Sequence, residues 1–263
     1  KELNGRFSFG TPRTSDGSLL FLQHLIHKME PTGSRIGIVF NGSPLFIGDA
    51  GSGESEIRKW IIENDFLECI VSLPVKLFFN TGIQTYLFIV SNKKKLNRRG
   101  RIQLIDGSIY GTSMRKNLGE KSNFITDEDS QKIIKTYQNF EENKFSKIFN
   151  NDYFGYNKIT IEQPLKVNGK VVYKHDGTPK PDSKLRDYER VPLGEDIQDY
   201  FSREVKPHLP DSWIDFEKNS TGYEINFTKY FYQHKTLRSP EDITKDLLKL
   251  EKETQNLLNQ ILE

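Results

Sequence analysis

The chain has 263 residues, which at roughly 150 residues per domain allows one or two domains with a core of ordinary size. Its single cysteine excludes a disulfide framework, and no apolar stretch reaches the roughly 20 residues that a membrane-spanning helix needs. Lysine and arginine number 38 against 36 acidic residues, so the net charge of +2 points to no nucleic-acid partner unless local clusters supply the contact. No secretory or transit segment is recognisable, so we expect a cytoplasmic protein, or a piece of one, that does not bind a membrane.

The first hundred residues alternate helical and extended patterns, which is typical of an α/β layer architecture. A helix capped by Asp16 should present apolar residues on one face. The almost continuous apolar run over 36–40 predicts a central, parallel strand that is covered on both faces. A second helix is expected over about 54–64, and it leads into a buried strand over 67–73.

An aromatic loop over 76–83 separates this strand from a second β-forming run over 84–90. About ten residues of loop are too few for a parallel crossover, so the two strands should be antiparallel. A charged turn over 93–101 leads into a further strand, and the sheet should therefore end in antiparallel strands. Another helix is predicted from Thr126, followed by acidic residues that suit its first turn.

The remainder of the chain has a different character. Proline and glycine lie among charges over 151–222, which predicts an irregular arm with one short helix near 196–205. From Pro240 the sequence predicts a helix with a heptad seam, to which these residues belong: Ile243, Leu247, Leu250, Leu257 and Ile261. Three heptads are marginal alone, so the seam should pack against a partner helix, in this chain or in another.

Few features indicate catalysis directly. The histidines and the cysteine show no metal-ligand spacing, so we expect no metal. Glycines at 48, 51 and 53 resemble a phosphate-binding turn, but the usual spacing and lysine are missing, and a flexible helix cap is the favoured interpretation.

Two segments are candidate binding sites. Phe78 and Phe79, beside Asn80, Thr81 and Gly82, could offer aromatic faces to a planar ligand, or they could simply fill a hydrophobic layer. The charged turn could neutralise DNA phosphates or be the solvated tip of a hairpin. Its six cations are Lys93, Lys94, Lys95, Arg98, Arg99 and Arg101.

An ordered set of segments is more specific than any single motif. It comprises Gly5-Arg6-Phe7 with Phe9-Gly10, the segments at 21–24, 33–39, 57–59, 70–74, 77–83 and 105–108, and those at 200–205, 207–215 and 222–225. This set resembles the modification (methyltransferase) subunit of type I restriction-modification systems over nearly the whole chain.

The resemblance implies a Rossmann-like methyltransferase sheet with antiparallel terminal strands, followed by a helical and irregular C-terminal extension. It implies methyl transfer from S-adenosylmethionine to the N6 atom of an adenine that is flipped out of duplex DNA, in complex with a specificity subunit and a restriction subunit. By position, Phe78 matches the aromatic residue that stacks on the flipped base, Phe79 is the adjacent candidate, and residues 80–82 support the loop. The terminal helix resembles the element that docks on the specificity subunit.

The chain also departs from the family pattern. It contains neither the glycine-rich cofactor motif nor an Asn-Pro-Pro-aromatic motif, and in the family both precede the position of Gly5. We therefore expect a partial, C-terminal half of the catalytic domain over 1–150, an irregular arm over 151–239 and a heptad helix over 240–263, with no catalytic residue and no bound cofactor. The alternative is a non-catalytic module that docks a specificity subunit and binds the DNA backbone.

Overall fold

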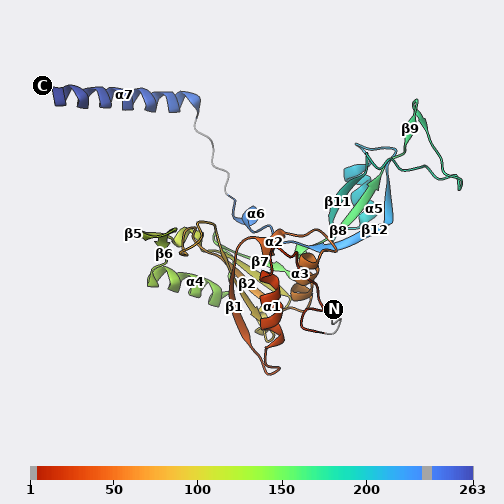
Figure 1. Cartoon of the computed structure of the whole chain (residues 1–263), viewed down its shortest axis with the longest axis horizontal. Helices are drawn as coiled ribbons and strands as arrows, with labels where there is room; N and C mark the ends of the chain where they lie inside the picture. The colour runs from red at the N-terminus through yellow and green to blue at the C-terminus, as the bar shows by residue number, and fades with distance from the viewer. Residues whose placement is uncertain (1–4, 233–238, 263) are drawn as a thin grey trace. The chain divides into compact units, whose positions relative to one another are not determined.

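The computed structural model describes residues 5–232 and 239–262, which fall into two compact units (Figure 1). The first unit ends at Phe231 and the second begins at Tyr232. Among the described residues, no helix combines the length and the apolar character needed to cross a bilayer.

The first unit is built on a mixed five-stranded sheet of order β1-β3-β2-β4-β7. Its strands are β1 (Arg35–Phe40), β2 (Leu67–Ser72), β3 (Tyr86–Ser91), β4 (Arg101–Asp106) and β7 (Ser146–Asn150). Strands β2 and β4 are parallel and every other pair is antiparallel, so the predicted antiparallel pairing of β2 with β3 and of the terminal strands is confirmed.

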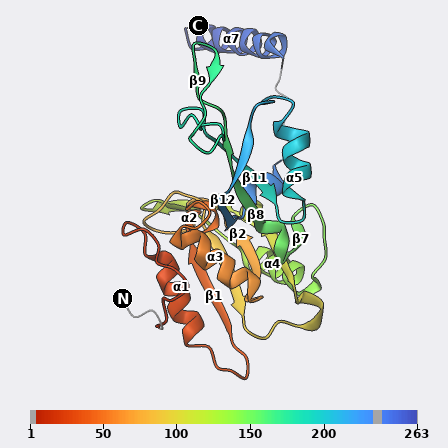
Figure 2. The ribbon, with the colours of Figure 1, turned by 90° about the vertical axis from the view of Figure 1, so that its right-hand side faces the viewer.

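Helices cover both faces of this sheet, as the α/β pattern predicts. They are α1 (Ser18–His27), α2 (Ser43–Phe46), α3 (Gly53–Glu63) and α4 (Asp127–Asn139). Figure 2 shows α1 and α3 on one side of the sheet and α4 on the other. Alternate residues of β3 point to opposite faces: Phe88 packs with α1 and α3, whereas Ile89 packs with α4. Ser52 and Thr126 cap α3 and α4 by accepting backbone N–H bonds, which explains where these two helices begin.

Strand β1 corrects one prediction, because it is an edge strand and not a central, parallel one. Within the described sheet it pairs with β3 alone, and the pairing is antiparallel. Its apolar residues are unequally covered: Phe40 is 5% exposed and Val39 is 44% exposed. Strand β1 therefore has the apolar composition typical of a strand that is buried on both faces, but it is not buried on both faces.

The path after β3 corrects a second prediction. The segment 92–100 is not a hairpin tip, because β4 lies beside β2 on the side away from β3 and runs parallel to β2. A short 3₁₀ turn, Leu96–Arg98, makes this connection.

Residues 151–231 hold more regular structure than the predicted irregular arm. A three-stranded antiparallel sheet of order β11-β8-β12 is formed by β8 (Gly155–Glu162), β11 (Asp187–Pro192) and β12 (Trp213–Tyr223). Its own core contains Ile159, Ile161, Val191, Phe201, Val205 and Ile214. The predicted short helix is confirmed as α5 (Ile197–Tyr200) and a π-helical turn, Phe201–Val205.

Smaller elements complete this unit. They are the hairpin β5 (Thr112–Leu118) with β6 (Lys121–Phe124), the short pair β9 (Lys166–Val167) with β10 (Lys170–Val171), two 3₁₀ turns (Ser108–Tyr110 and Asn151–Phe154) and α6 (Phe227–Phe231).

The second unit contains the predicted terminal helix, α7 (Pro240–Leu262). The hydroxyl of Ser239 accepts a hydrogen bond from the Asp242 backbone at 3.1 Å, which caps its first turn. Within this unit the seam residues Ile243, Leu247, Leu250 and Leu257 are exposed. The side chain of Ile261 lies outside the described residues.

Candidate functional site

The aromatic loop lies at the edge of the main sheet where β2 and β4 both end. Ser72 and Asp106 are register partners at the carboxyl ends of these two parallel strands. The Leu73 N–H donates to the Thr85 carbonyl at 2.8 Å, which closes the base of the loop between them. Ligands of open α/β sheets bind outside the carboxyl ends of parallel strands, so the loop occupies the expected edge.

The tip of the loop presents both phenylalanines to solvent. Phe78 and Thr81 form an isolated antiparallel bridge, which places Phe79 and Asn80 at the turn. Phe78 is 37% exposed and Phe79 is 58% exposed, whereas Leu77 packs against the hydrophobic cluster beneath. The hydrophobic layer is thus filled by Leu77, and the phenylalanine rings are available to a ligand.

The β5–β6 hairpin holds this tip by backbone contacts. The Lys76 carbonyl accepts hydrogen bonds from the N–H groups of Ser122 and Asn123, both at 3.1 Å. The Phe79 carbonyl accepts one from the Glu120 N–H at 3.1 Å. These bonds fix the tip against a hairpin that sequence reasoning missed. The available signal was Gly119, which has φ +62 at the turn.

The two phenylalanine rings differ in their contacts. The Lys121 ammonium lies 5.2 Å from the centroid of the Phe79 ring, so a cation covers one face of it. Among the described residues, no cation and no second ring stacks on Phe78. Phe79 is therefore the more exposed residue with a cation over its ring, whereas Phe78 is less exposed and has no cation or ring stacked on it among the described residues.

Polar side chains at the strand ends stabilise one another. One carboxylate oxygen of Asp106 accepts hydrogen bonds from the hydroxyls of Ser72 and Ser108 at 2.8 and 2.6 Å. The intervening Gly107 has no room for a side chain, because a Cβ would lie 2.6 Å from the Ser72 carbonyl oxygen. Burial, and secondarily the Asp106 charge, raise the pKa of the nearby Tyr86 phenol. These contacts fix the turn after β4, and they leave Asp106 hydrogen-bonded to the two serine hydroxyls.

Two of the six cations of the charged turn, Lys94 and Arg98, are buried. The ammonium of Lys94 lies 2.6 Å from Asp65, with its side chain 1% exposed. Arg98 lies 3.3 Å from Glu68, with side chains 3% and 1% exposed, and is stacked between the rings of Tyr137 and Phe140. Burial lowers the pKa of Lys94, and the bond to Asp65 opposes this. Both Lys94 and Arg98 are thus buried in ion pairs, and the phosphate contact expected of them stays a prediction.

The other four cations, Lys93, Lys95, Arg99 and Arg101, are exposed, yet they lie far from the aromatic loop. Strand β3 runs antiparallel to β2, so the turn that follows β3 lies at the opposite end of the sheet from the loop that follows β2. Six strand residues separate the two ends by about 20 Å. The two predicted binding segments therefore do not form one site.

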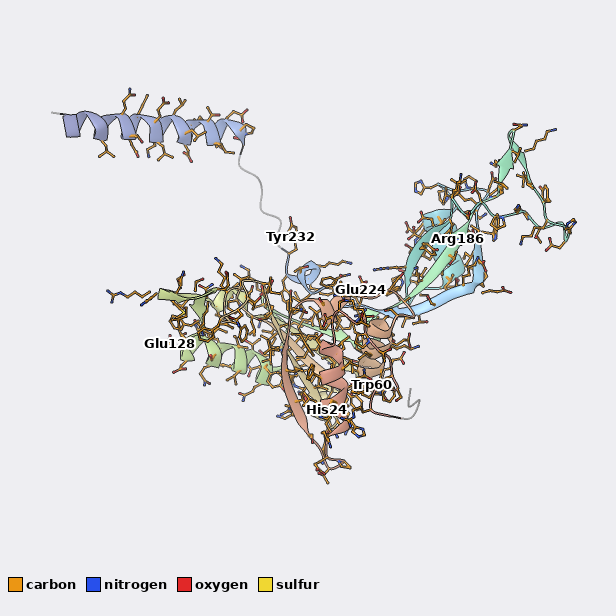
Figure 3. All side chains as sticks on the ribbon, viewed as in Figure 1. His24, Trp60, Glu128, Arg186, Glu224 and Tyr232 are labelled. Carbon is orange, nitrogen blue, oxygen red and sulfur yellow. The ribbon has the colours of Figure 1, made fainter. Side chains whose placement is uncertain are left out.

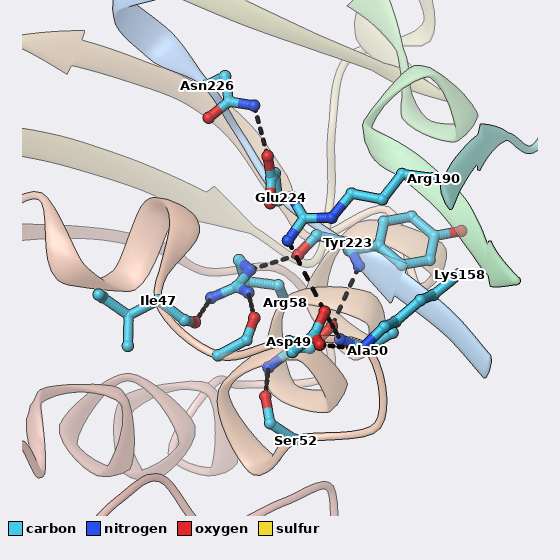
Figure 4. A network of polar contacts seen from close by, with 12 residues as sticks. Ile47, Asp49, Ala50, Ser52, Arg58, Lys158, Arg190, Tyr223, Glu224 and Asn226 are labelled. Carbon is cyan, nitrogen blue, oxygen red and sulfur yellow. Dashed lines mark hydrogen bonds and ion pairs between the residues drawn. The ribbon is translucent and has the colours of Figure 1, made fainter. Parts of the chain in front are cut away.

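Two of the three glycines before α3, Gly48 and Gly53, lie against other protein atoms, whereas Gly51 has open space around it. A side chain at Gly53 would collide with the Thr11 carbonyl oxygen. From the other side, the buried guanidinium of Arg58 donates to the carbonyls of Ile47 and Gly48 at 2.6 and 3.0 Å, and to that of Tyr223 at 2.6 Å (Figure 4). Burial lowers the pKa of Arg58 to about 10, so it stays charged at neutral pH. The described residues also contain no group of three or more side chains that could hold a metal ion.

Comparison with known proteins gives a consistent set of relatives. A family model for N-6 DNA methylases matches residues 1–170. The methylase subunit of the HindI type I restriction enzyme of Haemophilus influenzae is 36% identical over 106 residues, which is 40% of this chain and 23% of that subunit. The methylase subunit of the MjaIX type I restriction enzyme of Methanocaldococcus jannaschii is 27% identical over 161 residues, or 61% of this chain and 27% of that subunit.

Among solved structures, the crystal structure of the methyltransferase subunit of a type I restriction-modification system from Streptococcus thermophilus is similar. Its TM-score is 0.50 at 28% identity, over 57% of this chain and 31% of that one. The matched regions thus span about a quarter to a third of the relatives' lengths.

Proposed function

Because the chain belongs to the N-6 DNA methylase family, we propose that it is the C-terminal part of the methyltransferase subunit of a type I restriction-modification enzyme. The intact enzyme transfers a methyl group from S-adenosylmethionine to the N6 atom of adenine in duplex DNA. The relatives named above support this proposal, since each is the methylase subunit of a type I system.

The exposed aromatic tip carries the proposal for this chain. The N6 atom of adenine is reached when the base leaves the stack, and the departing base loses its stacking partners. Stacking of the base on an aromatic side chain contributes about 1 to 3 kcal/mol of binding free energy per base. Phe78 supplies such a face at the carboxyl ends of β2 and β4, with Phe79 beside it and Asn80, Thr81 and Gly82 shaping the turn.

The cofactor and the catalytic amide belong, in this proposal, to sequence that precedes this chain in the intact protein. The crowding at Gly48 and Gly53 supports this assignment, since the glycine-rich segment before α3 packs against other parts of the chain. When bound, the cofactor supplies the methyl group from its sulfonium. The unpaired edge of β1, with Val39 exposed, is where further strands of the same sheet would pair. We assign no step of methyl transfer to residues of this chain.

The remaining parts have assembly roles in this proposal. Residues 1–150 belong to the methyltransferase domain, 151–239 extend from it, and 240–263 dock on a specificity subunit, which brings the restriction subunit and the recognised duplex DNA into the same cytoplasmic complex. The exposed apolar seam of α7 supports this docking role, because a heptad seam is stable when a partner helix covers it.

The same seam favours a second candidate function, a module that docks a specificity subunit without taking part in base flipping. The two functions predict different effects of changes at Phe78. If the module is non-catalytic, the aromatic tip has no influence on methyl transfer.

The test replaces Phe78 with alanine in the longer protein that contains this chain, and follows transfer of a labelled methyl group to DNA at limiting DNA concentration. Loss of one stacked base should lower the rate by about 5-fold or more. The control is Phe216→Ala, which removes another exposed phenylalanine, 55% exposed against 37% for Phe78, from β12 in the three-stranded sheet. Equal methylation rates for Phe78→Ala and the unmodified protein would contradict the stacking role.

A further inference from the structure

We propose that the β5–β6 hairpin is a binding site for the phosphates of duplex DNA, through Arg115, Lys116 and Lys121. The inference rests on the proposed function, since it assigns the backbone contact that accompanies the base at the aromatic tip. In this inference the hairpin, and not the charged turn over 93–101, makes the phosphate contacts near the base, since the charged turn lies at the other end of the sheet.

The first argument is that the hairpin is exposed and has little core of its own. Six of the seven residues of β5 are exposed, and Met114 is half-buried. A two-stranded hairpin with no covered face is marginal by itself in water. Contacts with the loop tip hold it, including a hydrogen bond from the Asn123 side chain to the Val75 carbonyl at 3.0 Å. An element with this exposure has a surface available for a partner.

The second argument is the charge of that surface. Residues 112–124 contain three cations and one acidic residue, Glu120, so the hairpin has a net charge of +2. In the part of the chain that the structure describes, neither Arg115 nor Lys116 has an ion pair or a side-chain hydrogen bond. The exposed Arg203 differs, because it is paired with Glu195 and Glu204. Arg115 and Lys116 are therefore free to neutralise phosphate, whereas Lys121 also contacts the Phe79 ring.

The third argument is position. A base that stacks on Phe78 remains covalently joined to its strand, so the phosphates on either side of it lie close to the loop tip. The hairpin is bonded to that tip through Phe79 and Lys76. Lys121 lies over the Phe79 ring and belongs to β6, the strand that pairs with β5 (Figure 1 labels both strands). Base and flanking phosphates can therefore be bound side by side.

The experiment measures binding of a fluorescein-labelled, mixed-sequence duplex by the longer protein that contains this chain, by fluorescence anisotropy over a range of salt concentrations. Each phosphate contact contributes about 0.9 to the slope of log K against log salt, so Arg115→Gln with Lys116→Gln should reduce the slope by about 1.8. The double variant should consequently lose about 12-fold less affinity than the unmodified protein between about 50 and about 200 mM salt.

Two further variants control for charge and for folding. Lys95→Gln with Arg99→Gln removes the same charge from the opposite end of the sheet and should leave the slope unchanged. Arg115→Lys with Lys116→Arg keeps the charge and should keep the slope. An unchanged slope in the hairpin double variant, or an equal reduction in the opposite-end variant, would overturn the proposal.

Methyl transfer measured on the same samples separates this inference from the proposed function. If the unmodified protein transfers no methyl group while the hairpin variant still reduces the slope, the methylation proposal fails and the hairpin site is supported. If the unmodified protein does not bind the duplex at all, the hairpin site is refuted.

Discussion

At the scale of single residues, Arg98 shows how burial determines the role of a cation. Its guanidinium pairs with Glu68 and donates to the side chain of Gln103 at 3.1 Å, while two aromatic rings enclose it. Taking this ion pair out of water is costly, and removal of Arg98 would leave the buried Glu68 with Arg35, which is half exposed, as its remaining cationic partner at 3.2 Å. The residue therefore stabilises the connection between β3 and β4.

Arg98→Gln should accordingly lower the free energy of unfolding by up to about 3 kcal/mol, since Glu68 loses its nearly fully buried partner and keeps only the half-exposed Arg35. Urea denaturation followed by circular dichroism measures this change. The neighbouring Arg99 is exposed, and Arg99→Gln should alter the free energy of unfolding by less than about 0.5 kcal/mol. Similar stabilities for the two variants would show that the Arg98 ion pair is not the stabilising contact described here.

At the scale of elements, the three-stranded sheet carries a buried carboxylate with two cationic partners. Glu162, at the end of β8, has a side chain 1% exposed and lies 2.7 Å from Arg186 and 2.9 Å from Lys218 (Figure 3 labels Arg186). Burial alone would raise the pKa of Glu162, but the bonds from Arg186 and Lys218 outweigh it, and the pKa lies below its ordinary value of 4.5.

This pKa gives the stability of the sheet a defined pH dependence. A carboxyl whose pKa is lower in the folded state stabilises the fold above its unfolded-state pKa, and the contribution is lost as the pH falls through the folded-state pKa. At pH 7, Glu162→Gln should therefore melt at a lower temperature than the unmodified chain, and the difference should shrink below about pH 4.5. Thermal unfolding between pH 7 and pH 3 checks this.

The control for the pH experiment is Glu217→Gln, an exposed acidic residue on β12 of the same sheet. Its melting profile should follow that of the unmodified chain at every pH. A constant gap between Glu162→Gln and the unmodified chain down to pH 3 would mean that ionisation of Glu162 contributes nothing to stability.

The elements that sequence predicted well depend on local chemistry. Thr126 and the acids after it start α4 because capping involves neighbours in the chain. The antiparallel pairing of β2 with β3 follows from the length of the loop alone. Both features are visible within a dozen residues of sequence.

The features that sequence missed depend on contacts between distant segments. The link from β3 to β4 has the composition of a hairpin, and it crosses to the far side of β2 because Asp65 and Glu68 bury Lys94 and Arg98. Likewise, nothing in the aromatic loop itself reveals that Leu77 is covered, that Phe78 is exposed, or that residues 112–124 hold the tip. These outcomes are decided by tertiary packing, which local patterns do not encode.

At the scale of the whole molecule, the unpaired edge of β1 and the family match both bear on where the rest of the sheet and the cofactor site lie. The sheet ends at an apolar strand whose outer edge has no partner among the described residues, and the matched regions span about a quarter to a third of the relatives' lengths. In our account the aromatic tip stacks on the flipped base and the cationic hairpin binds DNA phosphates. The methyl donor is bound by a part of the protein that precedes Lys1.

The proposal that the cofactor site lies outside these 263 residues is tested by a calorimetric titration of S-adenosylmethionine. Titrated into the 263-residue chain, the cofactor should give no saturable heat; titrated into the longer protein that includes the preceding sequence, it should give a single saturable binding isotherm. Saturable binding of S-adenosylmethionine by the 263-residue chain itself would contradict the account, because the cofactor pocket would then lie within these residues.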